Sequence, residues 1–111
     1  MIDATEKYIE TFDEHTIQRF HTLYNLILES TTQEIEEKLW ARIPTISCGK
    51  RFVRLIPFKD HINIEAKGIL TYKDRLTGYK ITPKGMLQIR HEQEIPGEIL
   101  KLVFKESLET E

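Results

Sequence analysis

The segment that most constrains the fold is residues 51–66, which read RFVRLIPFKDHINIEA. If Lys59-Asp60 lies at the centre of a turn, the residues on either side pair as antiparallel strands: Ile56 faces Asn63, Leu55 faces Ile64, Arg54 faces Glu65 and Val53 faces Ala66. Apolar pairs then alternate with a polar pair and an opposite-charge pair, and each such pair stabilises a sheet by a few tenths of a kcal/mol. The pattern predicts a β-hairpin. Its loop should be a residue or two longer than the tightest turn, because Lys-Asp is not preferred there.

The turn of this hairpin can be interpreted either as a structural element or as a group of reactive side chains. Lys59-Asp60-His61 could be a reactive cluster, but its place between two strand patterns favours a turn. Alternation along the second strand then directs Ile62 and Ile64 into the core, while His61 points to the opposite face.

The N-terminal third of the chain is predicted to be helical. Residues 1–37 contain no Gly or Pro, and three residue pairs have the spacing of a helix capping box: Asp3 with Glu6, Thr11 with Glu14, and Thr31 with Glu34. From Ile17, apolar residues recur at three- and four-residue intervals, which predicts an amphipathic helix over about residues 13–30. After the third pair, the alternation of Ile35, Glu37 and Leu39 favours a short strand near residues 36–42 over another helix.

The rest of the chain reads mainly as strands and turns. The sequence predicts turns at Gly49-Lys50 and Pro83-Lys84-Gly85, a short helix over residues 69–76, a strand over residues 86–91 and a last helix opened by Ile95-Pro96-Gly97-Glu98. This order predicts a single domain over residues 1–111 of the α+β class. We expect an antiparallel β-sheet of about five strands, with the N-terminal and C-terminal helices packed on one face and the other face partly wet.

Charge is distributed unevenly along a chain whose net charge is −2. Residues 1–37 carry nine acidic and two basic side chains, residues 38–90 three acidic and twelve basic, and residues 91–111 six acidic and two basic. Either acidic helix faces lie beside a basic sheet for solubility and mutual attraction, or the segregation marks a binding surface. In the second interpretation, the partner-binding residues are Arg54, Lys59, His61, Lys84 and Arg90.

No motif for catalysis or nucleotide binding is complete. Cys48 is the only cysteine, no Cys-His motif surrounds it, and the glycines form no phosphate-binding loop. We therefore expect no enzyme activity and no cofactor-binding residues. No apolar run approaches the roughly 18 residues that cross a bilayer, and the N-terminus lacks a signal-peptide pattern, which predicts a cytoplasmic protein without a membrane partner.

Two further groups of residues have alternative interpretations. The acidic group could bind a hard cation or could form a solvated helix face; it consists of Glu6, Glu10, Asp13 and Glu14. The aromatic group lies among the basic residues of the middle segment and suits nucleic acid; it consists of Trp40, Phe52, Phe58, Tyr72 and Tyr79. Because the chain is mildly acidic and spells out no RNA-binding module, we place most of these aromatic residues in the core and do not expect nucleic acid as the partner.

Four segments of the chain carry a family resemblance: Leu39-Trp40-Ala41-Arg42-Ile43-Pro44, the Gly49-Lys50 turn, Ile56-Pro57-Phe58-Lys59-Asp60-His61-Ile62, and Pro83-Lys84-Gly85-Met86-Leu87-Gln88-Ile89. In them the chain resembles the YdhG-like family, small bacterial domains of largely unknown function that include frataxin-like iron chaperones. The resemblance extends over about residues 8–104. Members often have Gly-Met-Pro where this chain has Arg42-Ile43-Pro44.

The resemblance implies a frataxin-like sandwich. In such a fold, acidic residues on a helix and the neighbouring strand edge bind iron, and the sheet surface meets a partner such as an iron-sulfur or haem assembly protein. The first hypothesis is therefore an intracellular iron chaperone that binds iron weakly at the four acidic N-terminal residues. The competing hypothesis is an interaction module whose basic sheet binds an anionic ligand, an acidic protein surface or RNA.

Overall fold

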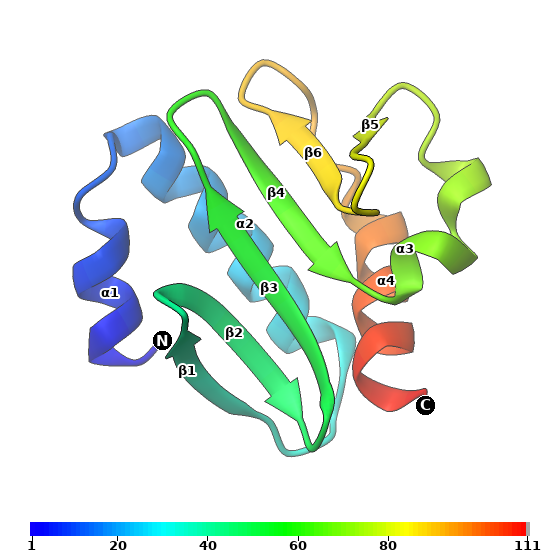
Figure 1. Cartoon of the computed structure of the whole chain (residues 1–111), viewed down its shortest axis with the longest axis horizontal. Helices are drawn as coiled ribbons and strands as arrows, with labels where there is room; N and C mark the ends of the chain where they lie inside the picture. The colour runs from blue at the N-terminus through cyan, green and yellow to red at the C-terminus, as the bar shows by residue number, and fades with distance from the viewer. Residues whose placement is uncertain (111) are drawn as a thin grey trace.

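The computed structural model describes residues 1–110, in which helices precede and follow the strands of a six-stranded sheet along the chain (Figure 1). In chain order the elements are α1 (Asp3–Ile9), α2 (Glu14–Ser30), β1 (Glu36–Trp40), β2 (Ile43–Cys48), β3 (Arg51–Pro57), β4 (His61–Ala66), α3 (Gly68–Thr71), the 3-10 turn η1 (Lys73–Arg75), β5 (Lys80–Ile81), β6 (Leu87–Arg90) and α4 (Gly97–Glu109). The predicted α+β class is confirmed.

The strands form one antiparallel sheet in the order β1-β2-β3-β4-β6-β5. The sheet has one strand more than the five or so that the sequence predicted. The additional strand is β5, whose two residues pair with Gln88 and Leu87 of β6. Two residues are too short to show an alternating pattern, so the sequence gives no sign of this strand.

The central hairpin has the predicted register. Val53 pairs with Ala66, Arg54 with Glu65, Leu55 with Ile64 and Ile56 with Asn63. Three residues lie between the two strands, and across the turn the N–H of Phe58 donates to the carbonyl oxygen of His61 at 2.8 Å. The structural role predicted for this turn is therefore confirmed.

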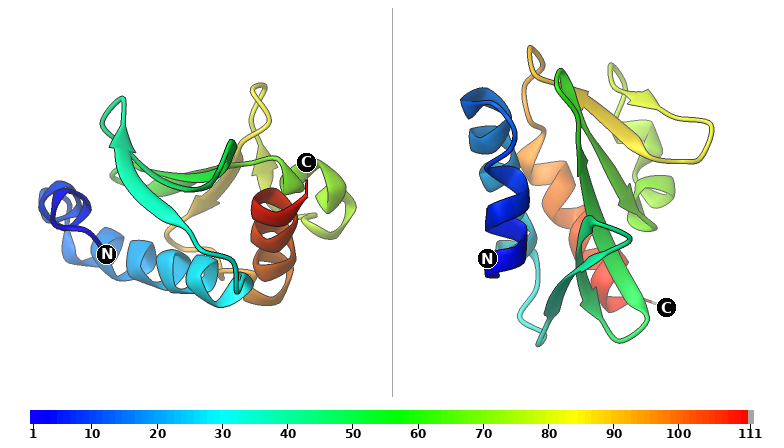
Figure 2. Two further views of the ribbon diagram at one scale, coloured as in Figure 1. Left: turned by 90° about the horizontal axis from the view of Figure 1, so that it is seen from below. Right: turned by 60° about the vertical axis from the view of Figure 1, so that its left-hand side comes forward.

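One face of the sheet is covered by α2 and α4, which also pack against each other (Figure 2). Every second residue of the central strands is buried there, including Ile62 and Ile64 of β4. They meet apolar side chains from both helices, such as Phe20 and Phe104. Full burial of a large apolar side chain is worth roughly 1.5–3 kcal/mol, so this layer is the main stabilising contact of the fold.

The helix ends correct the predicted capping boxes. The cap of α2 is Asp13, whose carboxylate accepts a hydrogen bond from the backbone N–H of Thr16 at 2.9 Å. Thr11 instead donates its hydroxyl to the carbonyl oxygen of Tyr8, and α1 begins after Ile2 without a side-chain cap. Thr31 ends α2 in an extended conformation, so the third box marks the end of a helix. Several residues could cap each helix, and the spacing alone cannot choose among them.

The sheet curves away from the helices at both sides. Figure 2 shows the β1–β2 turn and the β5–β6 turn rising from the side opposite α2 and α4. The β1–β2 turn consists of Ala41 and Arg42, which have φ angles of 52° and 64°. Two consecutive residues with positive φ match the twist of a two-residue hairpin, although neither is the glycine or asparagine that such turns prefer. The uncovered side of the sheet, here called the open face, is therefore concave.

The outer edge of β1 has a helix beside it. α1 packs next to β1, and the backbone N–H of Ile2 donates to the Glu37 carboxylate at 3.0 Å. The same carboxylate accepts the hydroxyl of Tyr24 at 2.6 Å, which links α1, α2 and β1. These contacts hold α1 against the first strand of the sheet.

Candidate binding surface on the open face of the sheet

A charged row crosses the open face near the middle of β1 to β4. Lys38, Thr45, Arg54 and Glu65 are neighbours in register on four successive strands. Alternate residues of a strand point to opposite faces, so the apolar residues on either side of this row point to the helices. The row therefore belongs wholly to the uncovered side.

Arg54 lies at the centre of the row and is almost fully buried, with 8% of its surface exposed. Its Nη1 donates to Oε1 of Glu65 at 3.0 Å, and its Nε donates to Oγ1 of Thr45 at 3.4 Å. Within residues 1–110, its Nη2 is buried without a hydrogen-bond acceptor. A buried donor left unpaired costs about 1–3 kcal/mol, so this arginine is not placed for stability alone.

Two aromatic rings flank the Arg54 guanidinium. Its central carbon lies 3.8 Å from the ring centre of Trp40 and 5.6 Å from that of Phe52. Both rings are on the surface, because Trp40 is 55% exposed and Phe52 is 37% exposed. The guanidinium is thus held between two rings that are themselves accessible from solvent, and it attracts both through their negative faces.

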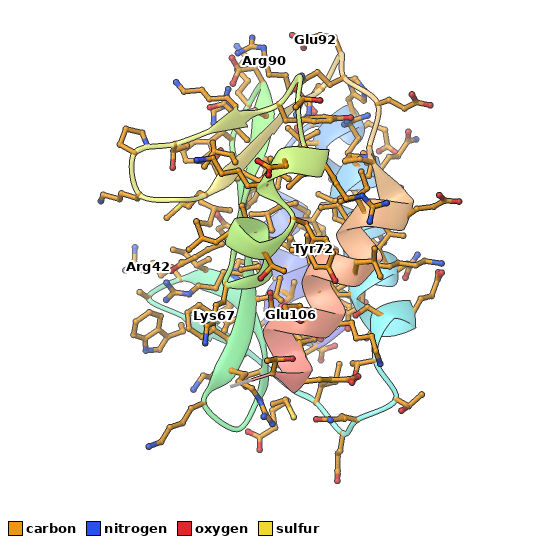
Figure 3. All side chains as sticks on the ribbon, turned by 90° about the vertical axis from the view of Figure 1, so that its right-hand side faces the viewer. Arg42, Lys67, Tyr72, Arg90, Glu92 and Glu106 are labelled. Carbon is orange, nitrogen blue, oxygen red and sulfur yellow. The ribbon has the colours of Figure 1, made fainter. Side chains whose placement is uncertain are left out.

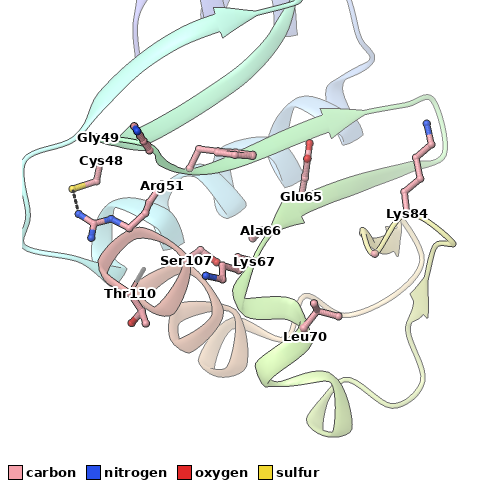
Figure 4. Close-up of a pocket in the computed structure, with 13 residues that line it drawn as sticks. Cys48, Gly49, Arg51, Glu65, Ala66, Lys67, Leu70, Lys84, Ser107 and Thr110 are labelled. Carbon is pink, nitrogen blue, oxygen red and sulfur yellow. Dashed lines mark hydrogen bonds between the residues drawn. The ribbon is translucent and has the colours of Figure 1, made fainter.

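Two connected hollows begin on the open face. The smaller, of about 310 Å³, lies between Lys38, Trp40 and Arg54. The larger, of about 770 Å³, extends past Lys67 to Lys84 of the β5–β6 turn (Figure 4). The two share the residues of the β2–β3 turn and its surroundings, namely Gly49, Lys50, Phe52 and Glu65. Together they form one channel that starts on the open face and continues round the end of the sheet to Ser107 and Thr110 at the C-terminal end of α4.

This channel is strongly basic. Among residues 1–110, six basic side chains line it, and we call it the basic trough after them: Lys38, Lys50, Arg51, Arg54, Lys67 and Lys84. Arg51 lies on the helix-covered side, where it contacts Cys48. Hydrogen bonds from closer partners, together with the positive charge of Arg51, lower the pKa of Glu109. Within the same residues the acidic lining is Glu65, which pairs with Arg54. The whole chain has a net charge of −2, so the trough gathers part of the positive charge of the middle segment. A concave surface lined by charges of one sign attracts ligands of the opposite sign.

The predicted partner-binding residues divide between two places. Arg54 and Lys84 line the basic trough, whereas Lys59 is exposed in the β3–β4 turn. Arg90 and His61 face each other in register at the far end of the sheet, and Figure 3 shows Arg90 well away from Lys67. The structure therefore does not gather these five residues into one surface.

The charged residues around Arg90 form ion pairs with one another. Arg90 pairs with Glu92 at 2.7 Å and with Asp60 at 3.5 Å. The ring of His61 lies 2.6 Å from Oδ1 of Asp60 and stacks on Phe58 with ring centres 4.5 Å apart. The hydrogen bond from His61, with further help from the positive charge of Arg90, lowers the pKa of Asp60. Little positive charge remains there to attract an anion.

The predicted metal-binding residues lie along α1 and at the start of α2. Glu6 is on α1 and Glu10 ends that helix, while Glu14 begins α2 and accepts a hydrogen bond from Gln18 at 3.3 Å. The backbone N–H of Thr16 lowers the pKa of Asp13, whose carboxylate serves as the helix cap. Within the described residues, no three His, Cys, Asp or Glu side chains are grouped so that they could hold a metal ion. The acidic site stays a prediction.

The prediction of core aromatic residues is wrong for three of the five. Trp40, Phe52 and Phe58 are all exposed. A signal for the first two was present, because Trp40 alternates with Lys38 and Phe52 with Arg54, which puts each ring on the same face as a cation. Lys38, Lys50 and Lys67 were also not singled out, since no local motif connects them.

The fold and the surface together define an α+β protein with a curved antiparallel sheet, two covering helices and a basic open face. Comparison with known proteins gives no match among family models, curated proteins or solved structures. The YdhG-like resemblance therefore stays a prediction. In the part of the chain that the structure describes, none of the helices has the length and apolar character needed to span a bilayer.

Proposed function

We propose that the protein is a binding module whose open sheet face recognises an anionic partner in the basic trough. The observation that carries the proposal is Arg54, a buried cation whose Nη2 lacks an acceptor in the described part of the chain. Burial of a charged group is expensive unless its hydrogen bonds are completed. An anionic oxygen from a ligand that reaches Nη2 would complete them.

The surroundings of Arg54 support an anion over a cation or an apolar ligand. Lys38 and Lys50 line the smaller hollow beside Arg54, and Lys67 and Lys84 line the larger one. Flexible lysines at the rim raise the local concentration of anions, and a planar arginine at the centre fixes their orientation. The trough thus combines long-range attraction with one ordered contact.

Inorganic polyphosphate is a suitable first probe, because it carries negative charge without any other recognisable group. Calorimetry at low salt should detect binding that weakens steeply as salt is added, since exposed charges are screened. Lys50→Ala and Lys84→Ala should each weaken binding several-fold. Lys101→Ala is the matched control, because Lys101 lies on α4 and pairs with Glu29. Equal effects of all three substitutions, or binding that is insensitive to salt, would overturn the proposal.

A further inference from the structure

We infer that the anionic partner is a single-stranded nucleic acid, with bases stacked on Trp40 and Phe52 and phosphates bound by the lysines of the basic trough. This inference rests on the proposed function and adds the chemical class of the ligand. It also revises the expectation from sequence, which placed most of the aromatic residues of the middle segment in the core and did not expect nucleic acid as the partner.

The first argument is the arrangement of flat rings around a cation. Trp40 and Phe52 are exposed, line the same hollow and flank Arg54 at 3.8 Å and 5.6 Å. Exposed aromatic rings are stacking platforms for unpaired bases, and guanidinium groups add a cation–π contribution. The bases of a duplex are already stacked on one another, so the platforms favour a single strand.

The second argument is the distribution of positive charge along the trough. Lys38 and Lys50 lie beside the rings, whereas Lys67 and Lys84 lie toward α3 and the β5–β6 turn. Figure 4 shows Lys84 on the β5–β6 turn at one side of the larger hollow and Arg51 at the other, with the Arg51 guanidinium directed toward Cys48. A ligand with one charge would leave most of these cations unused, whereas a strand with repeated phosphates can meet several of them.

The third argument distinguishes a nucleic acid from an acidic protein. Glu65 lines both hollows, with 33% of its side chain exposed, so its carboxylate can accept a hydrogen bond from a ligand. Oδ1 of Asn63, two residues away on the same strand, is buried and has no hydrogen-bond donor in the described part of the chain. Both groups accept hydrogen bonds, and the edges of nucleobases offer N–H donors that carboxylates lack.

The experiment uses the fluorescence of Trp40, which is the only tryptophan of the chain. Octauridylate, inorganic polyphosphate of equal charge and polyglutamate are titrated into the protein at the same salt concentration. We expect octauridylate to quench the fluorescence and to bind at least ten times more tightly than either of the other probes. If the four lysines each neutralise one phosphate, the plot of log affinity against log salt should have a slope of about −3, from about −0.7 per phosphate on a single strand.

Substitution of the aromatic residues measures the contribution of base stacking to binding separately from that of the charged residues. Binding of a fluorescein-labelled octauridylate is followed by anisotropy, so that Trp40→Ala can be measured as well as Phe52→Ala. Each should weaken binding roughly tenfold, the usual effect of removing a base-stacking ring. Phe58→Ala is the matched control, because Phe58 is a similarly exposed aromatic residue that does not line the trough. Circular dichroism confirms that each variant is folded.

The possible outcomes bear differently on the two proposals. Equal affinity for octauridylate and polyphosphate, with no loss in Trp40→Ala, would refute the nucleic-acid inference while leaving the anion-binding function intact. Tighter binding of polyglutamate would also refute it and would point to an acidic protein instead. Failure of every anionic probe to bind would refute both.

Discussion

Replacing the buried arginine of the open face tests whether that residue serves binding or stability. In Arg54→Met, the apolar stem of the side chain is kept, so packing between β2, β3 and β4 changes little. The variant loses an ion pair with Glu65, which is 33% exposed, and such pairs contribute about 0–1 kcal/mol. It also loses the stacking on Trp40, at a cost of about 0.5–1 kcal/mol.

One effect of the substitution raises stability and opposes these losses. Arg54→Met removes the buried Nη2 that has no acceptor in the described residues, which relieves about 1–3 kcal/mol. The net change in the free energy of unfolding should lie between about 1 kcal/mol lost and about 2.5 kcal/mol gained. Glu65→Gln behaves differently, because it leaves a buried guanidinium without its carboxylate. We expect it to lose about 1–3 kcal/mol, which is less than the roughly 3–5 kcal/mol for breaking a fully buried pair, because Glu65 is partly exposed.

Urea unfolding of the wild type, the two single variants and the double variant gives both changes and their coupling. Polyphosphate binding is measured on the same samples and should be greatly weakened in Arg54→Met. A loss of more than about 2 kcal/mol in Arg54→Met would refute the reasoning, because the ion pair would then be a structural element of the sheet. Retention of full binding would show that Arg54 does not contact the anion.

Three further predictions follow from other parts of the molecule. Ile64→Ala removes apolar atoms from a fully buried position and should lower the free energy of unfolding by about 2–4 kcal/mol in urea. His61→Ala at the turn should lower it by less than about 1 kcal/mol. Similar losses in the two variants would contradict the burial pattern of β4. Burial, together with the charges of His15 and Arg19, lowers the pKa of His91, so the unfolded chain binds the proton more readily and stability should fall as the pH drops through about 6.5. The urea midpoint of His91→Gln should depend less on pH in that range than that of the control His21→Gln, and equal dependence would exclude His91 as the cause. If the iron site implied by the family resemblance exists, anaerobic ferrous iron should broaden the NMR signals around Glu6, Glu10, Asp13 and Glu14, and broadening elsewhere, or none, would remove these residues from the proposal.

Local patterns explain why much of the sheet could be predicted. The hairpin register follows from neighbouring residues, because the apolar and charged partners on β3 and β4 are only separated by a short turn. The helix over residues 13–30 was equally clear, since α2 has a complete apolar stripe. In both cases, the residues that determine the element lie close together in the sequence.

The candidate site could not be predicted in the same way. Lys67 and Lys84 are brought to one hollow because β6 pairs with β4, which skips β5 in the sheet order. No local pattern specifies that pairing. The sequence places most of the five aromatic residues in the core, and only the position of Trp40 on the first strand of a sheet with an open face shows that this ring is exposed.

The two edge strands of the sheet limit how a partner can bind. A peptide can extend a sheet by adding a strand to a free edge, and unprotected edges also promote aggregation. Here one edge strand, β1, has α1 beside it, and the other, β5, is only two residues long. Recognition through backbone hydrogen bonds is therefore disfavoured at both borders. In the proposed function, a partner recognises side chains on the concave surface, so its specificity can be changed by substitutions that leave the backbone of the fold untouched.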